Sequence, residues 1–408
     1  MKLSFLTPFT ALALSLMTIG CNSDAPYDHN GEGIVICPGE IDLNLINEQN
    51  DFAFKYFKNI QNDDNGNIVI SPLSLSMTLA MAANGAEGET LDEILRVIGS
   101  DNTSLRNVNS QNSFLINVFP QLDPKTTLSL ANALWIHKDF SVKEQFRTLC
   151  ADTYDAEVNN IDMYSPAAKD IINKWAEEHT NGLIKNFLSE EPRKVLSIMN
   201  ALYFKGQWSD KFSKSDTHKA TFHNADGRNP QVSMMHDSNH VCGTLMDGGT
   251  MVVSLPYGNK AFRMTIIVPE EGTTTDQYAA HLTTEKWLGW QDDLLREGTR
   301  DLKMPKFDIE SQNEPIEMLR KLGMTRAFGD GAEFSGIAEG LQISSIKQKT
   351  HIIVDESGTE AAAVTDIGFD LTIAQPGTRT IVVDRPFIFI ISESGSSSIL
   401  FMSKINNL

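Results

Sequence analysis

The 408-residue sequence has few cysteines and a shortage of basic side chains. Its four cysteines form no C-x-x-C pair, which argues against a disulfide scaffold and favours buried thiols at Cys150 and Cys242. Lys and Arg total 34 against 53 Asp and Glu, giving a net charge of −19. Because phosphate binding needs clustered basic residues, nucleic acid is excluded as the main partner. No basic run suits a sulfated polysaccharide either.

Hydrolase and metal-site motifs are also missing. The chain contains no G-x-S-x-G and no H-E-x-x-H. Ser344 and Lys347 match S-x-x-K, but they lie in a strand-like stretch rather than at a helix start. His236, His240 and Cys242 have residue types that bind zinc. Without a helix they need not share a face, so we expect surface or partly buried histidines, no metal, no cofactor and no catalytic residue.

The first 42 residues differ from the rest. Residues 1–20 combine Lys2 with an apolar run, which is typical of a secretory signal peptide. Cys21 follows directly, as in the lipobox of bacterial lipoproteins, so we expect it to be lipidated; an ordinary signal peptide with an incidental cysteine is the alternative. Residues 21–42 then form a flexible tether. Asn22 does not resemble an inner-membrane retention signal, so we expect an exported protein anchored at the outer membrane or cell surface.

Residues 43–408 are expected to form one domain of the α+β class. Apolar residues recur at helical spacing from Asp42, and Ser71-Pro72 opens a second helix after the short strand 68–70. Helices continue to about residue 119, and another covers 167–180. From Leu196 onward, runs of branched and aromatic residues predict strands. Helices followed by strands indicate large mixed or antiparallel sheets.

Nine strings in this domain resemble serpin signatures and occur in the order found in that family. They are NIVISPLSLSMTLAMAANGAEGET, ANALWIHKDF, INKWAEEHTNGLIKNFL, NALYFKGQW, LKMPKF, LGMTRAF, FSGI, DESGTEAAAVT and DRPFIFII. The resemblance implies three β-sheets with about nine helices, an exposed reactive-centre loop and a metastable native state.

The resemblance also implies roles for residues of the central sheet. Those matching the family's shutter, where the sheet parts, and its breach, where loop insertion begins, are Ser71, Pro72, Ser74, Asn200 and Trp208. Gln348 stands where many members have a shutter histidine, and Ser403 replaces a small glycine in the last strand. We expect the first departure to alter how readily the sheet opens.

The segment after Val354 has the pattern of a strand that can insert. It matches the hinge of inhibitory serpins at Glu356, Gly358, Thr359, Glu360, Ala361, Ala362 and Ala363. Every second residue from Thr359 to Phe369 is uncharged, whereas the intervening set has three charges, as in a strand with one buried face. No proline interrupts residues 358–375. We therefore expect stored free energy, released when the loop is cut and inserts.

The resemblance also implies the position of the reactive bond, because serpins keep the distance from hinge to bond nearly fixed: counted from Gly358, the bond lies between Thr372 and Ile373, with Leu371 or Phe369 as alternatives. Small or medium apolar residues there favour elastase-like or subtilisin-like serine proteases, and Leu371 would also suit papain-like cysteine proteases. The expected function is suicide-substrate inhibition by a monomer that traps its target as a covalent acyl-enzyme. The rival is a non-inhibitory serpin acting as a binding or chaperone-like protein; such members usually have bulky or charged residues on the inserting face.

Overall fold

A computed structural model describes residues 34, 36, 39–60, 66–359 and 380–408. Within these ranges it has nine α-helices, as expected. They are α1 (Leu43–Asn59), α2 (Pro72–Ala83), α3 (Gly88–Val97), α4 (Leu105–Val118), α5 (Glu144–Tyr154), α6 (Ala167–His179), α7 (Thr275–Ala279), α8 (Thr284–Leu295) and α9 (Ile316–Lys321). None of the helices described is long and apolar enough to cross a membrane.

The start of α2 follows the sequence signal closely. Ser71 has an extended backbone and its side chain accepts a hydrogen bond from Ser74 N, while Pro72 occupies the first helical turn. Every residue of this helix is buried, because it packs against α1, α3 and α4 and against strands of both sheets. The predicted short strand before it is also confirmed, as β1 (Ile68–Ile70).

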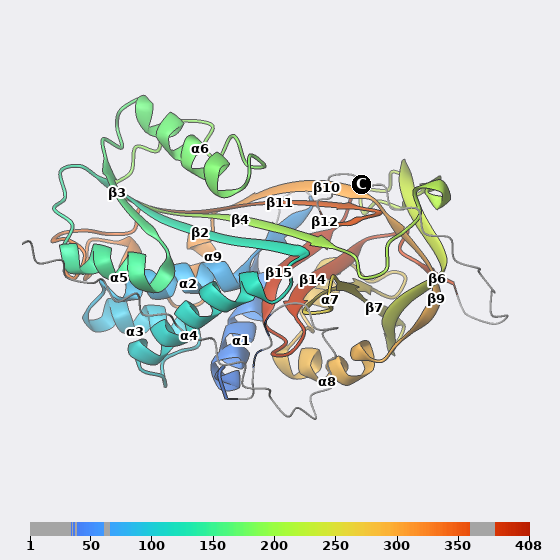
Figure 1. The fold of residues 1–408 in the computed structure, drawn as a ribbon. Coiled ribbons are helices and arrows are strands. Elements are labelled where there is room, and N and C mark those ends of the chain that lie inside the picture. The colour runs from blue at the N-terminus through green and yellow to red at the C-terminus, as the bar shows by residue number, and fades with distance from the viewer. Residues whose placement is uncertain (1–33, 35, 37–38, 61–65, 360–379) are drawn as a thin grey trace, which may run out of the picture.

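A six-stranded sheet forms one layer of the domain. Its strand order is β10-β11-β12-β4-β2-β3. The strands are β2 (Thr126–His137), β3 (Glu157–Ile161), β4 (Leu196–Gln207), β10 (Phe307–Asn313), β11 (Ser345–Asp355) and β12 (Gly358–Thr359). In Figure 1, α6 lies on one side of this sheet and α2 to α5 lie on the other.

A nine-stranded sheet contains the remaining strands. Its order is β1-β15-β14-β8-β7-β6-β9-β13, with β5 paired to β6. Its other members are β5 (His218–Thr221), β6 (Gln231–Asp247), β7 (Thr250–Tyr257), β8 (Phe262–Val268), β9 (Glu297–Pro305), β13 (Ile381–Val382), β14 (Phe387–Glu393) and β15 (Ile399–Ile405). Two of the three expected sheets are therefore hydrogen-bonded into one, because the long β6 pairs with β5 and β9 along one part and with β7 along another.

Two core clusters account for the layering. One lies between α1, α2 and the six-stranded sheet and includes Phe57, Leu79 and Ile198. The other fills the space between the two sheets with aromatic side chains such as Phe204 and Phe389. Strands β8, β14 and β15 are buried along their whole length, as their nearly continuous apolar sequences predict.

Candidate functional site

Strand β12 is the first part of the predicted hinge, and it lies between β4 and β11. Gly358 and Thr359 pair with Gln207 and Gly206 of β4 on one side. On the other side they pair with Asp355 and Val354 of β11. Further along, β4 and β11 are direct parallel neighbours over 197–202 and 345–350. The two central strands are therefore separated at one end by the hinge and joined at the other.

Thr359 points into the protein at this point. Its side chain is fully buried, and its Oγ1 lies 2.6 Å from the Tyr257 hydroxyl oxygen. Gly358 has a φ of 151°, and a Cβ there would lie 2.0 Å from the carbonyl oxygen of Gly206. Only glycine fits this close approach of two backbones.

Trp208 holds the turn between β11 and β12. Its backbone N–H donates to Ser357 O at 2.9 Å, and its indole N–H donates to Asp355 O at 2.9 Å. The indole stacks on Tyr257 with ring centroids 4.5 Å apart and an interplanar angle of 11°. The stacked pair Trp208 and Tyr257 thus contacts both the β11–β12 turn, through Trp208, and Thr359 of β12, through Tyr257.

Glu356 is anchored in the same turn. Its carboxylate is buried and accepts hydrogen bonds from Lys306 Nζ at 2.7 Å and Thr217 Oγ1 at 2.8 Å. Its carbonyl oxygen accepts from Phe212 N at 3.0 Å. Burial pushes the pKa of Glu356 upward, but the Lys306 ammonium and the other donors outweigh burial and lower that pKa overall.

Gln348 connects the six-stranded sheet to α2. Its Oε1 accepts from Ser71 N at 2.9 Å, and its Nε2 donates to Ser71 O at 2.9 Å and to Asn200 Oδ1 at 3.0 Å. Gln348 and Ser71 are fully buried. Gln348, which stands where many serpins have a histidine, therefore uses its oxygen and both amide hydrogens in hydrogen bonds, one of them to Asn200 of the neighbouring strand β4.

A second polar group extends this network to β2. Asn200 Nδ2 donates to Asn132 Oδ1 at 2.6 Å and also bonds Ser74 Oγ. Thr78 Oγ1 donates to the same Asn132 oxygen at 2.7 Å. The network joins α2 to three adjacent strands, so parting β4 from β11 separates Gln348 from Asn200.

Sequence reasoning missed five residues of these two groups. Tyr257, Thr217 and Lys306 complete the hinge end, and Asn132 and Thr78 complete the buried network. Thr78, Asn132 and Lys306 lie in the serpin-like strings of the sequence. The asparagine in Ala131-Asn132-Ala133 was a further signal, since buried polar groups need partners.

Predicted residues at several positions lie outside the part of the chain that the structure describes. These are Cys21, Glu360, Ala361, Ala362, Ala363, Phe369, Leu371, Thr372 and Ile373. Within it, Ser403 is fully buried, and its Oγ has no hydrogen-bond partner among the described residues.

The zinc-type residues of β6 have separate partners. His236 Nε2 lies 2.8 Å from Asp301 Oδ1, whereas the buried His240 faces Asp237 with Nδ1 3.3 Å from Oδ2. Cys150 and Cys242 are buried free thiols, as expected, and burial raises the pKa of each to about 12. These thiols are protonated at neutral pH.

A model of the serpin (serine protease inhibitor) family matches residues 47–408. The chain belongs to the serpin family. This serpin is 30% identical to Iripin-3 of Ixodes ricinus over 92% of its own length and 97% of that protein. The thermophilic serpin Tengpin in its native state is similar with a TM-score of 0.83, 29% identity and coverage of 92% and 97% of the two chains. Thyroxine-binding globulin with thyroxine gives 0.81 and 29%, covering 89% and 99%. Serpins are generally protease inhibitors rather than catalysts, although the family also includes binding proteins.

Proposed function

We propose that this serpin inhibits serine proteases by being cut once and inserting its cut loop between β4 and β11. The observation that carries the proposal is β12. Gly358 and Thr359 already pair with both strands, so the following residues have a site to continue into. An incoming strand would have the same antiparallel direction as β12 to both neighbours.

The chemistry needs no catalytic residue of this chain. The Ser Oγ of the protease attacks the carbonyl carbon of Thr372, and the peptide bond to Ile373 breaks. The serine proton passes through the protease histidine to the amine of Ile373, which leaves as the new amino terminus. The carbonyl of Thr372 stays attached to the protease as an ester, which water would hydrolyse if the protease stayed intact.

Insertion then prevents that hydrolysis. Extending β12 from Thr359 to Thr372 makes a strand about 45 Å long at about 3.3 Å per residue. The ester is carried this distance, and the pull distorts the oxyanion hole and triad of the attached protease. Thr359, Ala361 and Ala363 are small, which favours insertion over the alternative of a binding or chaperone-like serpin.

Elastase-like or subtilisin-like enzymes are the proposed targets, with papain-like cysteine proteases as further candidates. The apolar residues Leu371 to Ala374 suit their pockets, and Arg379 lies too far along for trypsin-like enzymes. We further propose that residues 1–20 direct export and that lipid on Cys21 anchors the protein in a bacterial envelope, on the outer membrane or cell surface.

Mixing the purified domain with elastase, subtilisin, chymotrypsin, trypsin and papain tests the proposal. We expect complexes that survive boiling in detergent with elastase or subtilisin and none with trypsin. Amino-terminal sequencing of the released peptide should begin at Ile373. Cleavage of the loop by all of these enzymes without any stable complex would instead support a binding role.

A further inference from the structure

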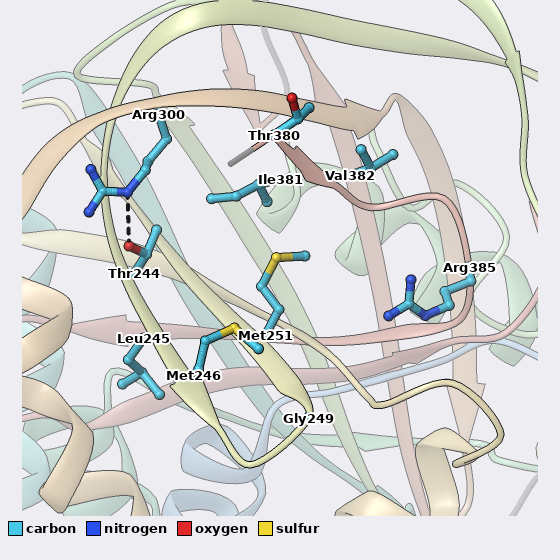
Figure 2. A pocket seen from close by; sticks show the side chains of 10 residues that line it. All are labelled: Thr244, Leu245, Met246, Gly249, Met251, Arg300, Thr380, Ile381, Val382 and Arg385. Carbon is cyan, nitrogen blue, oxygen red and sulfur yellow. Dashed lines mark hydrogen bonds between the residues drawn. The ribbon is translucent and has the colours of Figure 1, made fainter. Parts of the chain in front are cut away.

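A cavity of about 550 Å³ lies at the far side of the nine-stranded sheet from β1. It is open to solvent and is lined by the hairpin joining β6 to β7, by Arg300 of β9, by β13 and by Thr380 and Arg385 beside β13. Figure 2 shows Ile381 and Met251 in its middle, with Arg300 and Arg385 on opposite sides. Its volume lies within the range of about 300 to 1,000 Å³ that is usual for small-molecule sites.

The apolar part of the lining is rich in methionine. Leu245, Met246, Met251, Ile381 and Val382 all contribute. Met246 is 53% exposed, which makes it one of the few large apolar side chains of the described residues left open to solvent. Unbranched, polarizable methionine side chains adapt to ligands of varied shape, and they favour a hydrocarbon or an aromatic ring here.

The charge of the lining is opposite to that of the protein. The chain has a net charge of −19, yet the charged residues of the lining are the two arginines, and no carboxylate is among the described residues that form it. Three acids adjoin lining residues: Asp384 Oδ1 is 3.6 Å from Arg385 Nη1, Glu270 packs beside Gly249, and Asp301 Oδ2 accepts a hydrogen bond from Thr380 Oγ1 at 2.6 Å. None makes a short bond to the Arg385 guanidinium.

Arg385 has unused hydrogen-bonding capacity. Its Nη2 donates to Pro269 O at 3.2 Å, whereas its buried Nε has no partner in the part of the chain that the structure describes. Arg300 is held more firmly, since its Nε donates to Thr244 Oγ1 at 3.1 Å and its Nη1 to Thr299 O at 2.9 Å. The donor open to a ligand is Nη1, since Arg385 is partly exposed and its 3.6 Å contact with Asp384 Oδ1 is too long for a hydrogen bond. A guanidinium with such a donor beside an apolar wall suits a carboxylate that carries a hydrocarbon.

We propose that this cavity binds an amphipathic monocarboxylate, such as a medium-chain fatty acid. Its carboxylate lies at Arg385 and its hydrocarbon packs on Met251 and Ile381. The site is separate from the hinge and does not depend on protease inhibition. It does contact Ile381 and Val382 of the short strand β13, which pair with Leu302 and Lys303 of β9. A bound ligand adds contacts between β13 and the β6–β7 hairpin, so it should stabilise the native protein.

Isothermal titration calorimetry with octanoate, and with the uncharged octanamide as a matched probe, tests the proposal. We expect one site per chain for octanoate and binding at least about tenfold weaker for octanamide, because a charged hydrogen bond is lost. Octanoate should also raise the melting temperature in a concentration-dependent way.

Three substitutions locate the site, and one serves as a control. R385Q should weaken octanoate binding about tenfold or more, and R385K should restore part of it by restoring the charge. M251W should abolish binding by filling the cavity. R228Q removes the same charge from an exposed arginine elsewhere and should leave binding unchanged. Circular dichroism and melting curves show whether each variant folds.

Equal affinity for octanoate and octanamide would refute charge recognition by the cavity. Unchanged octanoate binding in folded M251W would mean that the ligand lies elsewhere. An absence of binding at millimolar octanoate would overturn the proposal outright, and none of these results would bear on protease inhibition, which the covalent-complex assay measures.

Discussion

The position of Thr359 makes a sharp prediction about the residues that follow it. Because its side chain is buried and bonds Tyr257, a strand that continues from Thr359 by the proposed insertion would have Ala361 and Ala363 on the same inner face and Ala362 on the outer face. The substitutions Ala361→Arg and Ala362→Arg therefore introduce the same charge one residue apart. The first should block insertion of the cut loop, and the second should allow it.

The magnitudes favour a clear difference between the two variants. Burying Ile367 and Phe369 on insertion contributes about 1.5 to 3 kcal/mol each, or about 3 to 6 kcal/mol together, before new backbone bonds are counted. An unpaired arginine on the inner face costs several kcal/mol, on the order of the whole gain. In a domain this large, about 3 kcal/mol corresponds to a melting-temperature shift on the order of 4 °C.

Scanning calorimetry before and after loop cleavage measures this difference. Each protein is nicked by a protease that cuts within residues 364–379 without being retained, and nicking is checked by mass spectrometry. Wild type and Ala362→Arg should melt at least about 4 °C higher once cut. Ala361→Arg should melt at nearly the same temperature cut or uncut, while its intact form matches the intact wild type.

Two outcomes would refute the reasoning. If nicked wild type melts no higher than the intact protein, the cut loop adds no strand. If nicked Ala361→Arg gains as much stability as nicked Ala362→Arg, the loop does not continue the alternation that Thr359 begins.

Three other predictions concern the hinge, the buried network and the core. The folded-state pKa of Glu356 lies below its ordinary value of 4.5, so its stabilising contribution is complete above about pH 4.5 and is lost as pH falls through the folded-state pKa. Glu356→Gln, which also weakens the bond to Lys306, should flatten acid melting curves between pH 6 and 3; an unchanged slope would count against this. Gln348→Ala should destabilise by about 2 to 4 kcal/mol in urea unfolding, since Ser71 N loses its partner and Ser71 O and Asn200 Oδ1 each lose a donor, and a change under 1 kcal/mol would show that water replaces them. Ser403→Ala should stabilise by about 1 kcal/mol by removing a buried, unbonded hydroxyl, unless unfolding shows a loss instead.

Local chemistry explains why much of the fold could be predicted. The Ser71-Pro72 helix start and the apolar strands β7, β8 and β14 are each specified by neighbouring residues, and the structure confirms them. Strand β2 received no prediction, although it lies in the middle of the six-stranded sheet. Its alternation is interrupted by Ala131-Asn132-Ala133, a stretch whose conformation is decided by contacts with β4 and α2 rather than by its own sequence.

Residues of the candidate site also differ in whether local sequence could identify them. Residues such as Gly358 and Trp208 lie in distinctive local motifs, which is why the sequence could identify them. Lys306 lies in the string LKMPKF and Tyr257 in no quoted string, but neither position indicates its partner. They reach Glu356 and Thr359 only because strands distant in sequence become neighbours. Such hydrogen-bond partners depend on tertiary packing, which a single sequence does not reveal.

The position of β12 between one end of β4 and β11 has a kinetic consequence. Beyond it, β4 and β11 remain paired directly over six residue pairs, from Ser345 with Ser197 to Thr350 with Leu202. Because β12 already separates one end, the inserting strand of the proposed mechanism can advance one residue at a time. Each β4–β11 pair is then replaced by a pairing with β4 and a pairing with β11 before the next pair separates. The six pairs therefore need not separate all at once. The Gln348–Asn200 pair is the third from the end nearest β12, so the proposed insertion would separate it only after two other pairs.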